Sequence, residues 1–136
     1  MSNWTHVAGI VRIDMFRSGY IPDQAFVDFA VETFGKEIHY GSPDELWDEA
    51  YKHPERFLPL GSEGSLSMSV WVNPDVNSVA AFTVSVFGDL RDHDDTDEII
   101  EWFKNKCNDE DLIIRNAVIT VHNEYNGDRT WTYEED

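Results

Sequence analysis

The densest group of side chains that could do chemistry follows directly after a strongly apolar stretch. It consists of Asp89, Asp92, His93, Asp94 and Asp95. Carboxylate oxygens with one imidazole could bind a divalent cation. The segment is not an EF-hand loop, because Asp97 stands where the glycine of that turn would fall. Carboxylates ahead of a helix also cap its first turn and suit its dipole, and we favour that interpretation over a metal site.

Other reactive side chains give no catalytic pattern. The five histidines are scattered without zinc-ligand spacing, and we expect His6 and His122 to be half-buried, hydrogen-bonded imidazoles on central strands. Cys107 falls on an apolar helical stripe, where a free cysteine behaves as a small hydrophobe. The segment 61–64 (Gly-Ser-Glu-Gly) lacks the register of a nucleophile elbow. We therefore predict neither an enzyme nor a cofactor.

Charge is the strongest compositional signal. The formal net charge is −17 over 136 residues. It argues against binding nucleic acid through phosphates and against an anionic membrane surface, because both need Lys and Arg. It fits a basic protein partner, a divalent cation or high solubility. The excess acids fall on the expected helical zones and the C-terminal tail.

The composition predicts one folded domain, residues 1–136, because hydrophobic residues make up 41% of the chain. A single cysteine excludes an intramolecular disulfide and suits the cytoplasm. The sequence contains neither a long apolar run nor a charged-then-apolar leader, so we expect neither a membrane span nor a signal peptide.

Periodicity predicts the elements that position these groups. Strands are expected at 4–14, 65–72 and 79–87, around 117–121 and, after the Asn-Gly turn at 126–127, at 129–133. Gly9 interrupts the alternation of the first strand, which is typical of a bulge. Helices are expected at 22–34 and 95–107, each with an apolar stripe. A capping-box pattern at 42–45 predicts a further short helix.

This order is βαββαβ with a short inserted helix and an extra C-terminal hairpin strand. It predicts an α+β fold of the ferredoxin-like class, an antiparallel sheet with two helices on one face. The other face would carry Trp71, Thr83, Ser85 and Phe87. Because that face and the 129–133 edge would leave apolar side chains in water, we expect a homodimer.

The helix begun by Asp95 places its acids on the solvent side, at about the spacing of nucleic-acid phosphates. We therefore predict a surface that binds a basic protein partner, with Trp71 as an aromatic anchor. Its residues are Asp94, Asp95, Asp97, Glu98, Glu101 and Trp71.

Three segments together resemble small uncharacterised acidic proteins of tailed bacteriophages: 4–14, 61–65 and 88–92. The resemblance implies a phage-encoded inhibitor or regulator, in the host cytoplasm, of a host defence or nucleic-acid-handling protein. Two alternatives stay open. One is a small-ligand, nucleotide-like binding or sequestering oligomer that uses the free sheet face and the 54–64 loop, and the other is a metal-assisted enzyme.

Overall fold

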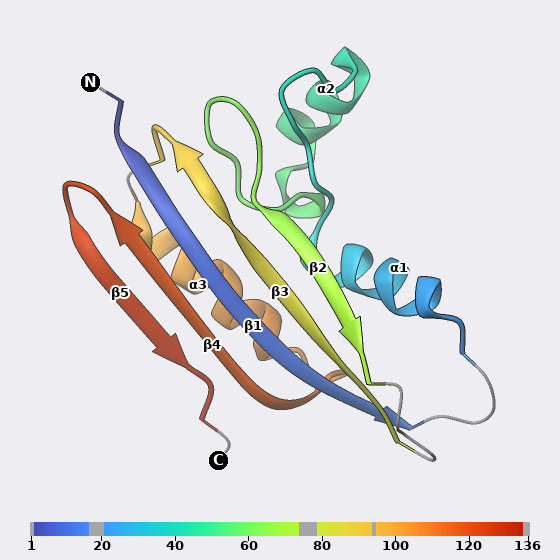
Figure 1. Ribbon diagram of the computed structural model, residues 1–136. Coiled ribbons are helices and arrows are strands. Elements are labelled where there is room, and N and C mark those ends of the chain that lie inside the picture. Colours follow the sequence, from blue (N-terminus) through green and yellow to red (C-terminus); the bar gives the residue numbers. More distant parts are fainter. Residues whose placement is uncertain (1, 17–20, 74–78, 94, 135–136) are drawn as a thin grey trace.

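The computed structural model describes residues 2–16, 21–73, 79–93 and 95–134. These form one five-stranded antiparallel sheet with three α-helices (Figure 1). The elements are β1 Trp4–Phe16, α1 Asp23–Phe34, α2 Asp44–Lys52, a 3-10 turn Pro54–Arg56, β2 Ser67–Val72, β3 Val79–Arg91, α3 Thr96–Cys107, β4 Ile113–Asn123 and β5 Gly127–Thr132. The strand order is β2-β3-β1-β4-β5, so β1 is central. None of the described helices is long and apolar enough to span a membrane.

Strand β1 aligns the sheet, because it pairs along its whole length with β3 and along most of its length with β4. Its residues alternate strictly: Val7, Gly9, Val11 and Ile13 are buried, and the residues at positions 8, 10 and 12 lie on the other face. The bulge expected at Gly9 does not form. This residue pairs with Val86 of β3 and with Ile119 of β4 without a shift in register. A Cβ there would lie 3.1 Å from Ile119 Cγ1, so the glycine allows close packing instead.

Both long helices cover the same face of the sheet. One buried cluster contains the inward residues of α1 and α3 together with alternate residues of β1, β3 and β4. On α1 these are Phe26, Ala30 and Phe34, and on α3 they are Ile99, Phe103 and Cys107. Burial raises the pKa of the Cys107 thiol to about 12, as expected for a cysteine that serves as a core residue.

Two further local predictions were wrong. The strand expected at 79–87 does not end there but continues as β3 to Arg91, because the long β1 offers Trp4, Thr5 and His6 as ladder partners. The capping box also does not form. Pro43 is the N-cap of α2 without a side-chain hydrogen bond, and the Ser42 hydroxyl accepts from the His39 N–H instead.

The remaining elements agree with the periodicity. Helices α1 and α3 begin within a residue of the predicted positions and end where predicted, and the Asp95 carboxylate caps α3 by accepting from the Glu98 N–H. The Asn-Gly turn joins β4 to β5, which is an edge strand. The α+β class and the antiparallel sheet are confirmed.

Candidate functional site

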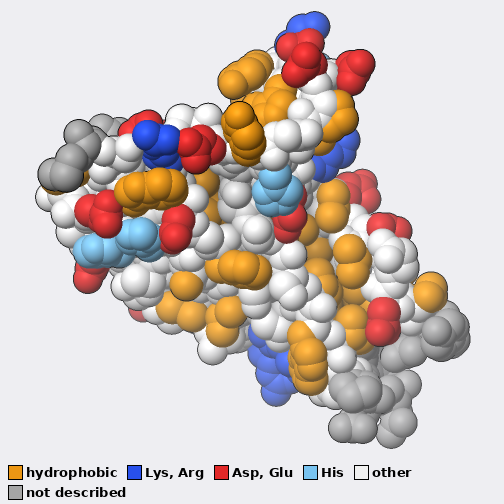
Figure 2. All heavy atoms as spheres, turned by 45° about the horizontal axis from the view of Figure 1, so that its top comes forward, with side chains coloured by type: hydrophobic (Ala, Val, Ile, Leu, Met, Phe, Trp, Pro, Cys, Tyr) orange, Lys and Arg blue, Asp and Glu red, His pale blue; other side chains and the backbone are white. Residues whose placement is uncertain are grey.

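No helix covers the second face of the sheet in the described part of the chain (Figure 1), and we call this the open face. Apolar side chains lie exposed on it: Trp71 is 55% exposed, Ile10 49% and Phe87 44%. In Figure 2 a histidine pair lies among acidic side chains at one end of this face, and a basic patch lies at the other end. The open face therefore has an apolar middle between two ends of different charge.

A cavity of about 510 Å³ lies at the basic end of the open face. Its walls come from the three central strands: Ile10, Arg12, Thr83, Arg115, Asn116, Ala117 and Val118. Among these described lining residues, both charged groups are arginines and none is acidic. That is unusual surface chemistry in a chain whose net charge is −17. The volume falls in the range of small-molecule sites.

A β-bulge brings Arg115 to this cavity. The pairing of β1 with β4 shifts between Arg12, which faces Asn116, and Ile13, which faces Ile114. Arg115 is the extra residue, so it and Asn116 are both exposed while Ile114 and Ala117 on either side are buried. Bulges re-aim side chains in this way.

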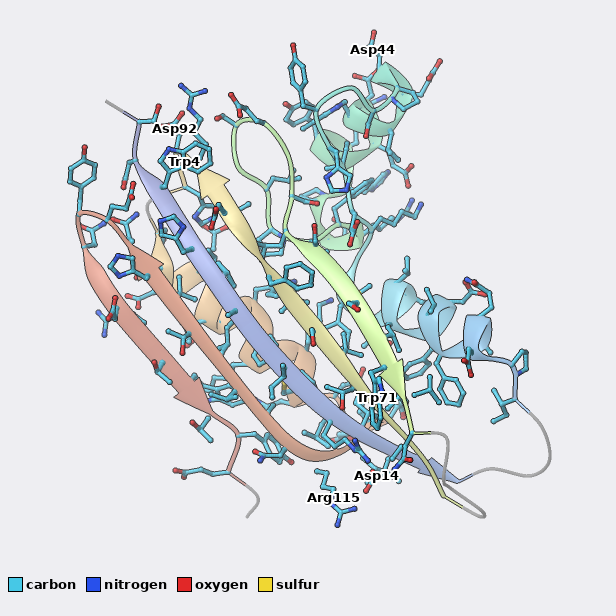
Figure 3. All side chains as sticks on the ribbon, in the orientation of Figure 1. Trp4, Asp14, Asp44, Trp71, Asp92 and Arg115 are labelled. Carbon is cyan, nitrogen blue, oxygen red and sulfur yellow. The ribbon has the colours of Figure 1, made fainter. Side chains whose placement is uncertain are left out.

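Asp14 holds the two guanidinium groups near each other. Its Oδ2 atom is 3.4 Å from Arg115 Nη1, and its Oδ1 atom is 4.0 Å from Arg12 Nε. Arg12 also lies over the Trp71 ring, 5.8 Å from its centroid, and donates to the Thr83 hydroxyl at 3.4 Å. Trp71, Asp14 and Arg115 lie close together at this end of the sheet in Figure 3. Arg115 remains 70% exposed, so most of its five donors face solvent.

The opposite end of the open face holds a paired histidine cluster. His6 and His122 face each other in register on β1 and β4, and their rings stack with centroids 5.8 Å apart. His6 Nδ1 lies 2.6 Å from Asp89 Oδ1, and its Nε2 lies 3.4 Å from Glu124 Oε2. His122 is paired with Asp128 of β5. The hydrogen bond to Asp89 is the main reason that the pKa of His6 is raised above its ordinary value.

We expect NMR titration of the imidazole C–H signals to place the pKa of His6 above 6.5 in the wild type. Replacing Asp89 with Asn should lower it toward the ordinary value, because the largest cause of the shift is lost. Because the pKa of His6 is higher in the folded than in the unfolded protein, the protonated imidazole stabilises the folded state. This stabilisation is fully present below the unfolded pKa and is lost as pH rises through the folded pKa. An unchanged His6 pKa in Asp89→Asn would contradict this assignment.

The residues predicted to bind a basic partner do not form one surface. Asp95, Asp97, Glu98 and Glu101 are exposed on or beside α3, on the helix-covered side, whereas Trp71 lies on the open face. Asp94 falls outside the described residues. Two of these acids already have partners within the chain, since Asp95 caps the helix and Asp97 lies 3.1 Å from Arg129 Nε.

The acidic group after the apolar strand is also dispersed. Asp89 belongs to β3 and pairs with His6, while Asp92 accepts from the Ser62 hydroxyl. His93 Nε2 lies 3.9 Å from a Glu98 carboxylate oxygen, and Asp95 serves as a cap. Within the described ranges, no three His, Cys, Asp or Glu side chains could hold a metal ion together.

The loop proposed as part of a ligand site does not reach the open face. Residues 54 and 57–60 instead line a separate cavity of about 330 Å³ against α3, together with His93, Glu98, Ile99 and Trp102. This cavity is mainly apolar. The free sheet face and the 54–64 loop, which were predicted to form one ligand site, therefore lie on different sides of the sheet. The arginine-lined cavity is complete without the loop.

Sequence reasoning missed the arginine site and the histidine pair. Part of the arginine site could have been found from the sequence. Arg12 and Asp14 are two residues apart on a strand and must therefore share a face. No comparable signal placed Arg115 beside Asp14 or His122 beside His6, because both contacts depend on the register of β4.

No known protein family, curated protein or solved structure matches this chain. The resemblance to phage proteins therefore remains a hypothesis.

Proposed function

We propose that this protein binds a small anionic molecule in the arginine-lined cavity of its open face. The observation that supports this most is that Arg12 and Arg115 both line this cavity, while Asp14 is the one carboxylate of the described residues within ion-pair distance of either guanidinium group. This excess of positive charge occurs in a chain of net charge −17. Guanidinium groups present planar forks of N–H donors that match carboxylate and phosphate oxygens. The ligand class is thus a carboxylate or phosphate on a compact body.

The walls of the cavity favour a ligand whose body is apolar or aromatic. Ile10 and Val118 supply apolar contact beside the arginines, and Asn116 and Thr83 supply polar atoms that could orient the ligand. Trp71 lies over Arg12 from β2, at the border of the site. A nucleoside monophosphate or an aromatic carboxylate meets both requirements, an anionic group and a flat ring.

We infer further that the scaffold is a ferredoxin-like sheet with one added strand. The order β2-β3-β1-β4 with every neighbouring pair antiparallel supports this inference, as does the placement of α1 and α3 between successive strands of the chain. The fold class itself carries no activity, so the functional argument depends on the cavity.

Calorimetric titration tests the proposal with adenosine 5′-monophosphate, benzoate and inorganic phosphate as probes. Adenosine and benzamide serve as neutral counterparts. We expect the anions to bind and the neutral molecules not to bind. Replacing Arg115 with Ala should weaken anion binding about 10- to 100-fold, because a charge-assisted hydrogen bond contributes about 1.5–3 kcal/mol.

Arg56→Ala is the matched control, since it removes an exposed guanidinium from the 3-10 turn, away from the cavity. It should leave anion affinity unchanged. Comparison of phosphate with benzoate tells whether the anionic group alone suffices. Equal binding of adenosine and its monophosphate, or no effect of Arg115→Ala, would contradict the proposal.

The acidic exposed side of α3 supports a second proposal, the binding of a basic protein partner. The orientation predicted from periodicity is the one observed, because Ile99, Phe103 and Cys107 face the core while Glu98 and Glu101 face solvent. Like charges three residues apart on a helix mildly destabilise it, and a basic partner would relieve that cost. This surface is separate from the cavity, so the two proposals do not exclude each other.

A further inference from the structure

The open face is bipolar along its strands. Arg12 and Arg115 lie at one end around the Asp14 carboxylate, and Asp89, Glu124 and Asp128 lie at the other end beside the histidine pair. Arg12 lies six positions after His6 along β1, which is about 20 Å at about 3.3 Å per residue. Between the two ends lies a shallow apolar hollow of about 330 Å³, lined by Ala8, Gly9, Ile10, Ser85, Val86, Phe87, Val118 and Thr120.

We propose that two copies of this chain pack open face to open face as a two-fold symmetric dimer. In such an interface the same surface patch occurs on both copies, so every contact is made twice. A two-fold axis running across the strands near Gly9 reverses the strand direction in the second copy. It therefore places the arginine end of each copy against the acidic end of the other.

The register of the sheet fits this axis. Gly9 pairs with Val86 of β3 and with Ile119 of β4, so these three residues mark the middle of the three central strands. A rotation about that line brings Arg12 opposite the His6 and Asp89 region of the second copy. It brings the Arg115 bulge opposite the region of His122 and Glu124. Small and apolar side chains meet in the middle, where sheets pack about 10 Å apart.

The size of the face is sufficient for a stable dimer. It is built from two strands of 13 residues, one of 11 and two of six. At about 4.8 Å between strands and about 3.3 Å per residue, it offers at most on the order of 800 Å² per copy. Standard protein interfaces bury about the same area per partner. A dimer would also remove Ile10, Phe87 and Trp71 from water.

Sedimentation equilibrium with charge reversal tests the proposal. We expect the wild type to be dimeric at tens of micromolar in low salt. Arg115→Glu and Glu124→Lys should each weaken the dimer at least 10-fold, because each places like charges across both symmetric contacts. The double variant Arg115→Glu/Glu124→Lys inverts both ends and should restore dimerisation. Arg56→Glu, with the same charge change away from the open face, should have no effect.

Three results would overturn the proposal: a monomeric wild type at low salt, a dimer that survives both single reversals, or no restoration in the double variant. A dimer that survives both single reversals would indicate pairing through the β5 edge. A monomeric wild type would indicate that the open face binds a different partner. Circular dichroism confirms that each variant is folded. Anion titrations on Glu124→Lys keep this test separate from the ligand proposal, since that variant retains both cavity arginines and should bind the anion even if the dimer is lost.

Discussion

Phe82→Ala is expected to lower the free energy of unfolding by about 3–5 kcal/mol. Phe82 is fully buried on β3, and its ring lies 5.1 Å from that of Phe26 and 5.8 Å from that of Phe29. It also pairs with Ile13 of β1 and Val72 of β2 in the ladder. Removing the ring would leave a cavity where α1 contacts the sheet, and urea unfolding followed by circular dichroism measures the loss.

Phe87→Ala is the matched control for this substitution. It lies on the same strand and removes the same ring, but from the open face, where Phe87 is 44% exposed. We expect a loss within about 1 kcal/mol when it is measured at low micromolar concentration, where self-association contributes least. Equal losses at the two positions would contradict the assignment of one face to the core of the chain and the other to its surface.

The second large effect is expected at Gly35, where Ala should cost about 3 kcal/mol or more. Gly35 has φ 132° and ψ 166°, a region of backbone conformation that essentially only glycine adopts, and occupying it with another residue costs about 1–3 kcal/mol. A Cβ there would also lie 2.5 Å from the carbonyl carbon of Phe57 and 2.6 Å from Leu58 N. Both are backbone atoms, so the 57–58 segment would have to move.

That movement would break a specific contact between Lys36, just after α1, and the segment 56–58 at the end of the 3-10 turn. Lys36 N donates to the Arg56 carbonyl at 2.9 Å, and Leu58 N donates to the Lys36 carbonyl at 3.0 Å. Gly41→Ala is the control, because Gly41 also has positive φ, at 97°, but a Cβ at this position would meet no atom of the described residues within 4 Å. It should cost only about 1–2 kcal/mol. Similar losses at 35 and 41, measured by thermal unfolding, would show that the close approach to Phe57 has no energetic effect.

Local chemistry explains why the elements could be predicted. A helix with Phe26, Ala30 and Phe34 on one side must bury that side, whatever the rest of the chain does. The alternation in β2, which places Trp71 outward and Val70 inward, follows from the pleat alone. The Asp95 cap likewise depends on a backbone N–H three residues away.

Predictions failed where another hydrogen-bonding arrangement competes with the local signal. The Gly88 region has the composition of a turn, but β1 offers it a continuous ladder and the strand continues to Arg91. Ser42 has the spacing of a capping residue, yet its hydroxyl accepts from the His39 N–H. In both cases the backbone hydrogen bonds are satisfied by another arrangement that the sequence pattern does not encode.

The amino-acid sequence by itself determined the α+β class, the strong negative charge, the acidic exposed side of α3 and the outward position of Trp71. Each of these depends on composition or on a period of a few residues. Only the tertiary structure decided that Arg12 and Arg115 share a cavity, that His6 stacks on His122, and that the two pairs lie at opposite ends of one face. The physical reason is register: residues more than a hundred positions apart meet because β4 pairs with β1, and one bulge turns Arg115 toward Asp14.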